Sequence, residues 1–141
     1  MMDIYEAMKR RHSIRKYLRK PIEEEKALAL REFISSLSEE SGLRIELVTN
    51  DPDAFSGKLA HYGSFEGCEN YFLIIADKKR DEDVGYFGEK LVLFSEQIGL
   101  NTCWVALTYN KTSVKTRLEK GERVAIVISV GYGKFRGLPH K

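Results

Sequence analysis

Hydrophobic and polar positions along the chain predict a mixture of helices and strands. Apolar residues recur three and four positions apart over residues 21–40 and again over 81–98, which predicts two amphipathic helices. Alternating or continuous apolar stretches predict strands at 43–49, 70–76, 102–108 and 123–131. Shorter helices are expected at 54–62 and 111–120. This mixture predicts an α+β sandwich in which helices flank a central sheet of about four strands.

A further short helix is expected to open the chain. Asp3 is followed three residues later by Glu6, which is the spacing of a capping box: Asp3 would cap the first turn and Glu6 would reach back to it. Ile4, Tyr5 and Met8 would give this helix an apolar side. The strongly basic stretch that comes next therefore begins where this helix ends.

That stretch, residues 9–20 with the sequence KRRHSIRKYLRK, is called the basic segment below. It contains seven Lys or Arg residues within twelve positions. Arg11, Ser13 and Arg15 alternate within it, so in an extended chain their side chains would project to one side. Two guanidinium groups and a hydroxyl suit a phosphate, which Arg binds through paired charge-assisted hydrogen bonds. A solvated charged face is the alternative interpretation, and it is the commoner one for such stretches.

Composition narrows the function further. The 141 residues fit one domain, and their net charge is +2. Because the basic segment alone carries seven positive charges, the rest of the chain is net acidic, which favours a local anion site over an extended nucleic-acid surface. Cys68 and Cys103 form no CxxC pair, and no secretory signal or membrane-spanning stretch is visible, so a cytoplasmic protein is expected. The three His residues have no spacing typical of a metal site.

Two separated motifs resemble those of the nitroreductase family. Residues 5–8 (YEAM) and 10–17 (RRHSIRKY) are similar to the family's N-terminal signature, Arg-Arg-x-Ser-x-Arg-x-aromatic. Residues 99–104 (GLNTCW) are similar to its Gly-Leu-Gly-Thr-Cys-Trp segment. The resemblance covers essentially the whole chain. It implies a nitroreductase-like α+β fold and an enzyme that uses flavin mononucleotide (FMN).

The resemblance also implies a site. The residues expected to contact the FMN phosphate and ribityl chain are Arg11, His12, Ser13 and Arg15. The backbone expected beside the flavin ring is that of Val105, Ala106 and Leu107. Lys134 and Arg136 would be further phosphate ligands, or else a solvated basic tail.

The implied activity needs no catalytic side chain, because the flavin carries the chemistry. Hydride would pass from NADH or NADPH to FMN and then to a nitroaromatic, quinone or related small-molecule acceptor in a ping-pong reaction. The resemblance further implies a homodimer with the flavin at its interface. The local charge, the histidine spacing and the lack of a membrane-length apolar stretch predict no nucleic-acid, metal or membrane partner.

One family feature is missing from the sequence. Most members carry Ala-Pro-Ser-x-x-Asn-x-Gln-Pro-Trp after the first long helix, where this chain has SGLRIEL at 41–47. The chain therefore resembles the N-terminal half of the branch typified by a Thermotoga protein, and residues 1–141 are expected to form one domain of that kind. A non-catalytic flavin-binding or structural half-domain is the alternative function. A nucleic-acid binder that uses the basic segment is a third.

Overall fold

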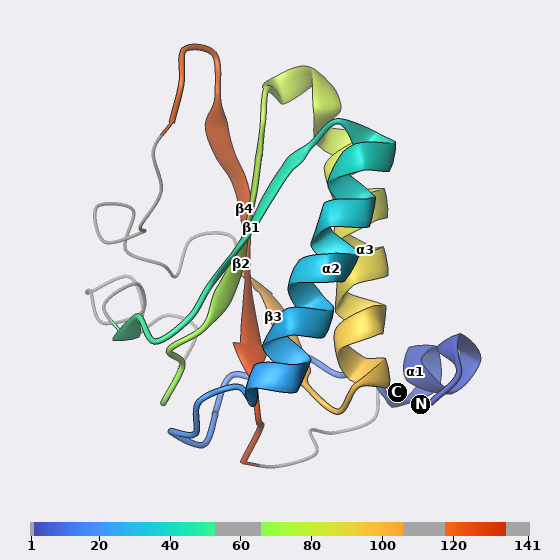
Figure 1. Cartoon of the computed structure of the whole chain (residues 1–141), viewed down its shortest axis with the longest axis vertical. Helices are drawn as coiled ribbons and strands as arrows, with labels where there is room; N and C mark the ends of the chain where they lie inside the picture. Colours follow the sequence, from blue (N-terminus) through green and yellow to red (C-terminus); the bar gives the residue numbers. More distant parts are fainter. Residues whose placement is uncertain (1, 53–65, 106–117, 135–141) are drawn as a thin grey trace.

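The structure, a computed structural model, describes residues 2–52, 66–105 and 118–134, and Figure 1 shows how the helices and strands of these ranges are arranged. In chain order they are α1 (Ile4–Arg10), α2 (Glu24–Ser41), β1 (Arg44–Val48), β2 (Tyr71–Ala76), the 3-10 helix η3 (Lys78–Arg80), α3 (Asp81–Gln97), β3 (Asn101–Val105) and β4 (Arg123–Gly131). The strands form one sheet in the order β1-β2-β4-β3, and every neighbouring pair is antiparallel. The predicted α+β class is confirmed, and α2 and α3 lie against the same face of the sheet (Figure 1).

Strand β2 occupies the centre of the sheet, and all six of its residues are buried. Alternate side chains along a strand point to opposite faces. Phe72 and Ile74 accordingly enter the large core under α2 and α3, while Tyr71 and Leu73 enter a second cluster on the other face. Burial on both faces explains why the sequence of β2 is continuously apolar rather than alternating.

The two long helices pack on this core and on each other. Phe33 of α2 stacks on Phe94 of α3, with ring centroids 4.2 Å apart. Helix α3 ends within one residue of its predicted end, and Gly99 follows it with φ at +86°, a conformation that suits glycine. Helix α2 begins at Glu24, three residues after Pro21, so the predicted start at position 21 is wrong.

Several shorter predictions have mixed outcomes. The helix expected at 111–120 is wrong over 118–120, which are not helical, and its other residues lie outside the described ranges. The helix expected at 54–62 lies outside them as well. Strand β3 begins one residue before its predicted start, and β4 has the predicted bounds. None of the helices in the described part of the chain is long and apolar enough to cross a membrane.

Helix α1 packs beside α3 at the edge of the molecule (Figure 1). Its predicted cap forms, because Asp3 Oδ1 accepts a hydrogen bond of 2.9 Å from Glu6 N. The reciprocal half of the capping box is not seen, and Glu6 instead forms an ion pair of 3.0 Å with Arg10. The predicted apolar side is exposed to solvent: the exposed fractions are 42 % for Ile4, 73 % for Tyr5 and 55 % for Met8.

Candidate functional site

Residues 13–17 of the basic segment run along one end of the sheet. Ser13 forms a parallel bridge with Thr102 at the edge of β3, and Ile14 N donates to Thr102 O at 3.0 Å. Further on, Tyr17 forms an antiparallel bridge with Gly133, just after β4. Ile14 and Tyr17 are both buried. These isolated bridges, rather than a regular strand, fix the path of the segment.

Tyr17 is the principal anchor of this path. Its hydroxyl lies 2.8 Å from Ser129 Oγ in the interior, and burial raises the pKa of the phenol well above its ordinary value. Two glycines allow the close approach. Gly67 has φ at +70°, and a Cβ there would lie 2.3 Å from Tyr17 O, while a Cβ on Gly131 would lie 3.1 Å from the Tyr17 ring. The backbone around Tyr17 is therefore packed too tightly to shift easily.

The three residues predicted to face one side, Arg11, Ser13 and Arg15, all act on the thiol of Cys103 in β3. The thiol is buried, which raises its pKa. The pKa of the same thiol is lowered by the charge of Arg15, by a hydrogen bond with Ser13 and by the charge of Arg11. Ser13 bridges to Thr102, the residue before Cys103, and Arg11 and Arg15 lie two positions to either side of Ser13 in the chain. This places two guanidinium groups and a hydroxyl together at the edge of the sheet.

Arg11 links this group to the helices. It follows α1 as the C-cap residue, and its side chain is only 19 % exposed. Arg11 Nε lies 3.7 Å from Glu89 Oε1 on α3, and Arg11 Nη1 is buried without a hydrogen-bond partner among the described residues. Glu96, also on α3, has its pKa raised by burial, and Arg11 partly offsets this. A buried donor without a partner is costly, so Arg11 has unused capacity to bind an anion.

The far end of the basic segment forms a second charged group. The antiparallel bridge places Lys16 opposite Lys134, and Lys134 N donates to Lys16 O at 2.9 Å. The Lys134 ammonium lies 2.6 Å from Glu66 Oε1. The pKa of Glu66 is lowered, chiefly by the hydrogen bond and charge of Lys134 and also by Lys16 and Arg19. The structure thus brings Lys134 to the basic segment, as a phosphate ligand would require.

The remaining predicted residues are less informative. His12 is half-buried within the basic segment. Val105 ends β3 with its side chain buried, so that only its backbone could contact a ligand. Ala106, Leu107 and Arg136 lie outside the described residues. Sequence reasoning missed Glu66, and no local signal could have found it, because it lies 68 positions from Lys134.

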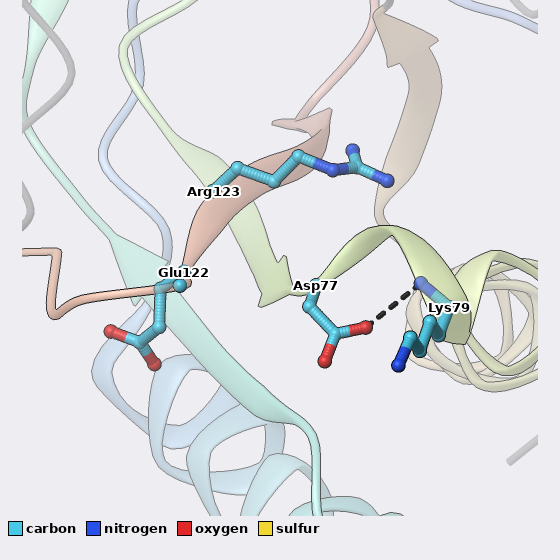
Figure 2. Close-up of a pocket in the computed structure, with 5 residues that line it drawn as sticks. Asp77, Lys79, Glu122 and Arg123 are labelled. Atoms are coloured by element: carbon cyan, nitrogen blue, oxygen red, sulfur yellow. Dashed lines mark hydrogen bonds between the residues drawn. The ribbon is translucent and has the colours of Figure 1, made fainter.

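A hollow of about 470 Å³ lies elsewhere, at the opposite end of β4, and Figure 2 shows its lining. Its charged side chains do not converge on one point: Glu122 and Arg123 point away from each other (Figure 2). Glu122 is 2.8 Å from Arg44, and Arg123 is 2.6 Å from Asp81. These ion pairs already engage the charged groups of Glu122 and Arg123, so we place the candidate site at the basic segment. No cluster of potential metal ligands occurs within the described ranges.

These observations define a class of protein. It has an α+β fold and a cationic site at the edge of an antiparallel sheet. A family model described as "Putative TM nitroreductase" matches residues 3–141. The chain therefore belongs to this nitroreductase family, as its two motifs predicted, and nitroreductases are oxidoreductases. No curated protein matches it.

Solved structures agree on the fold. A nitroreductase with bound FMN from Desulfitobacterium hafniense has a TM-score of 0.76 at 15% identity, covering 100% of this chain and 95% of that one. A "Putative NADH dehydrogenase/NAD(P)H nitroreductase" from Bacteroides thetaiotaomicron scores 0.74 at 22% identity, with 100% and 93% covered. An FMN-dependent nitroreductase from Clostridium difficile scores 0.71 at 21% identity, with 96% and 90% covered.

Proposed function

We propose that this protein is an FMN-dependent oxidoreductase of nitroreductase type, with NADH or NADPH as reductant and a nitroaromatic, quinone or related small molecule as acceptor. The observation that carries the proposal is the cationic stretch that bridges to β3 through Ser13 and Thr102, with Arg11 Nη1 buried and without a partner among the described residues. Family membership and the FMN-bound neighbour support the choice of FMN. The name of the Bacteroides neighbour supports a nicotinamide reductant.

The chemistry of the donor set fits the phosphate of FMN. A phosphate monoester carries close to two negative charges at neutral pH and offers several acceptor oxygens. Arg11 has a buried Nη1 without a partner among the described residues, and Arg15 and the Ser13 hydroxyl lie near the same thiol. Guanidinium groups bind phosphate oxygens through paired, charge-assisted hydrogen bonds. A neutral ligand would gain no charge-assisted hydrogen bond acceptor of this kind for the two guanidinium groups.

When bound, FMN supplies reversible hydride transfer, which lets reduction by NAD(P)H alternate with oxidation by the acceptor. The protein's own part is to bind and orient. Arg11 and Arg15 would neutralise the phosphate, and Ser13 would donate a hydrogen bond. Val105 ends the edge strand β3, and by resemblance to the family its backbone would run beside the flavin ring. Each described residue to which we assign a role would bind or orient the cofactor, and none would form a covalent bond with it.

We further propose that the protein acts as a homodimer in the cytoplasm. Helix α1 packs beside α3 but buries only Ala7, while Ile4, Tyr5 and Met8 stay exposed. A second copy that covers this apolar side would supply the missing burial. Cys68 and Cys103 are both free thiols, which fits a reducing compartment. Sedimentation of wild type and Tyr5→Glu tests the dimer, because the variant should be monomeric.

Titration of FMN fluorescence tests the flavin proposal. We expect wild type to bind FMN, and we expect Arg11→Ala/Arg15→Ala to bind it about 100-fold more weakly or worse, since each charge-assisted contact contributes roughly 1.5–3 kcal/mol. Lys9→Ala/Arg10→Ala is the matched control, because it removes two charges from the same segment. Arg10 is largely exposed and is paired with Glu6, so this control should bind nearly as well as wild type.

Three results would count against the proposal. Wild type that fails to bind FMN would refute the flavin site. Equal losses in the two double variants would mean that charge in general, not the placement of Arg11 and Arg15, attracts the flavin. FMN bound without NADH or NADPH oxidation in the presence of a quinone would favour the non-catalytic half-domain instead.

A further inference from the structure

Glu66 places a carboxylate in the middle of the cationic group at the far end of the basic segment. Its Oε1 lies 2.6 Å from the Lys134 ammonium. Lys16 and Arg19 also act on it electrostatically, in the same direction as Lys134. Glu66 thus occupies the kind of position that an anionic ligand of Lys134 would take.

The backbone holds Glu66 at this position. Glu66 N donates to Arg15 O at 2.9 Å, and Glu66 O accepts from Tyr17 N at 2.8 Å. A parallel bridge between Lys16 and Glu66 adds to these bonds. Because Tyr17 is itself anchored in the interior, the carboxylate is tethered beside Lys134 at a high effective concentration.

A phosphate that approaches Lys134 competes with this carboxylate for the ammonium. The Lys134 ammonium has three donors, but a compact charge engaged at 2.6 Å is largely compensated already. Arg11 differs, because its nearest described carboxylate is 3.7 Å away and its Nη1 has no described partner. The two ends of the site are therefore not equally ready to accept an anion.

We propose that Glu66 is a tethered competitor for the FMN phosphate at Lys134, and that it lowers the affinity for FMN relative to a flavin without a phosphate. The proposal rests on the proposed function, since it assumes that the phosphate reaches Lys134. In this arrangement Glu66 sets how strongly the protein prefers the phosphorylated flavin. Exchange of the carboxylate for the phosphate accompanies cofactor binding.

The experiment compares FMN with riboflavin, which lacks the phosphate. Both flavins are titrated by fluorescence into wild type, Glu66→Gln and Glu69→Gln. Glu69 is a matched control, because it lies on the same stretch of chain and approaches Arg19 at 3.9 Å rather than Lys134. We expect Glu66→Gln to bind FMN about three- to fivefold more tightly, the size usual for an exposed ion pair. Riboflavin affinity should not change, and Glu69→Gln should show a smaller gain.

A second pair of variants tests the route through Lys134. In a Lys134→Met background, Glu66→Gln should no longer change FMN affinity, because the group for which the two anions compete is gone. Glu66→Ala repeats the test with a side chain that cannot form a hydrogen bond to Lys134, as Gln still could. A circular dichroism melt checks that each variant is folded.

The outcomes separate this inference from the function on which it rests. Wild type that does not bind FMN would overturn both. Wild type that binds FMN, with Glu66→Gln and Glu66→Ala unchanged, would overturn the inference alone. An equal gain for riboflavin, or a gain that persists without Lys134, would also overturn it, since neither result can come from competition with a phosphate.

Discussion

Replacement of Gly88 by Ala tests the packing of α3 against β3. A Cβ at Gly88 would lie 2.4 Å from Trp104 Cη2 and 3.1 Å from Trp104 Cζ3. It would also lie 3.2 Å from Cδ1 of Ile74, a fully buried residue of the central strand. Neither neighbour can retreat freely, because the Trp104 ring is packed against the main core and Ile74 is enclosed within it.

The magnitude follows from two opposing effects. Overpacking of a core typically costs about 1–3 kcal/mol. Ala in place of Gly within a helix contributes about 0.8–1 kcal/mol in the other direction. We therefore expect Gly88→Ala to lose up to about 2 kcal/mol of unfolding free energy. A Cβ at Gly85, one turn earlier on α3, would have no neighbour within 4 Å, so Gly85→Ala should gain about 0.8–1 kcal/mol.

Urea denaturation followed by circular dichroism measures both variants. The difference in unfolding free energy between the two variants measures the clash with Trp104 and Ile74, because both variants make the same Gly-to-Ala change in the same helix. In a Trp104→Phe background, which lacks Cη2, the loss caused by Gly88→Ala should shrink. Equal stability of the Gly85 and Gly88 variants would refute the packing of Trp104 on α3.

Two further substitutions test the interior. Tyr17→Phe removes the 2.8 Å hydrogen bond with Ser129 and should cost about 1 kcal/mol in urea denaturation, and an unchanged midpoint would contradict the anchoring role. Burial raises the pKa of Glu96, so the native state loses stability as pH rises from the ordinary pKa of the carboxyl through its raised value. Glu96 also lies in the last turn of α3, where a negative charge is unfavourable, so Glu96→Gln should stabilise the protein by roughly 0.3–1 kcal/mol at pH 7. The gain should vanish at about pH 3, where the carboxyl is protonated in both states, and a gain that persists there would refute the assignment.

Much of the sheet and both long helices could be predicted because their signals are local. Strand β4 has the predicted bounds, since a continuous Val and Ile stretch allows little else. Helix α3 ends near Gly99 as predicted, because a glycine after the last apolar residue of a stripe ends many helices. In both cases the residues that determine the boundary are neighbours in sequence.

The start of α2 could not be predicted, because contacts with a distant residue fix it. Glu23, the N-cap residue, donates its backbone N–H to the Tyr132 hydroxyl at 3.3 Å, and that hydroxyl donates to the Glu23 carboxylate at 2.9 Å. Lys20 and Lys26 lie over the same ring, 4.3 Å and 5.1 Å from its centre. A residue more than one hundred positions away thus sets where the helix begins, and Pro21 alone does not.

In the candidate site, too, features with a local signal could be predicted and those that depend on distant residues could not. The spacing of Arg11, Ser13 and Arg15 predicted one anion site, and the structure holds this stretch against β3 through the bridge from Ser13 to Thr102. The spacing said nothing about the carboxylates that face these cations. Glu89 comes from α3 and Glu66 from a distant stretch of chain, and both pairings depend on the tertiary fold.

The packing of the basic segment also explains why the cations stay together. Like charges close to one another repel, by about 1 kcal/mol per pair at contact distance in water. Ile14 and Tyr17, which lie between the charged residues, are buried in the second core cluster. Burial of each such side chain contributes roughly 1.5–3 kcal/mol, which outweighs that repulsion. The cationic group is therefore formed before any anion arrives, and an anion that binds it need not order this stretch of chain.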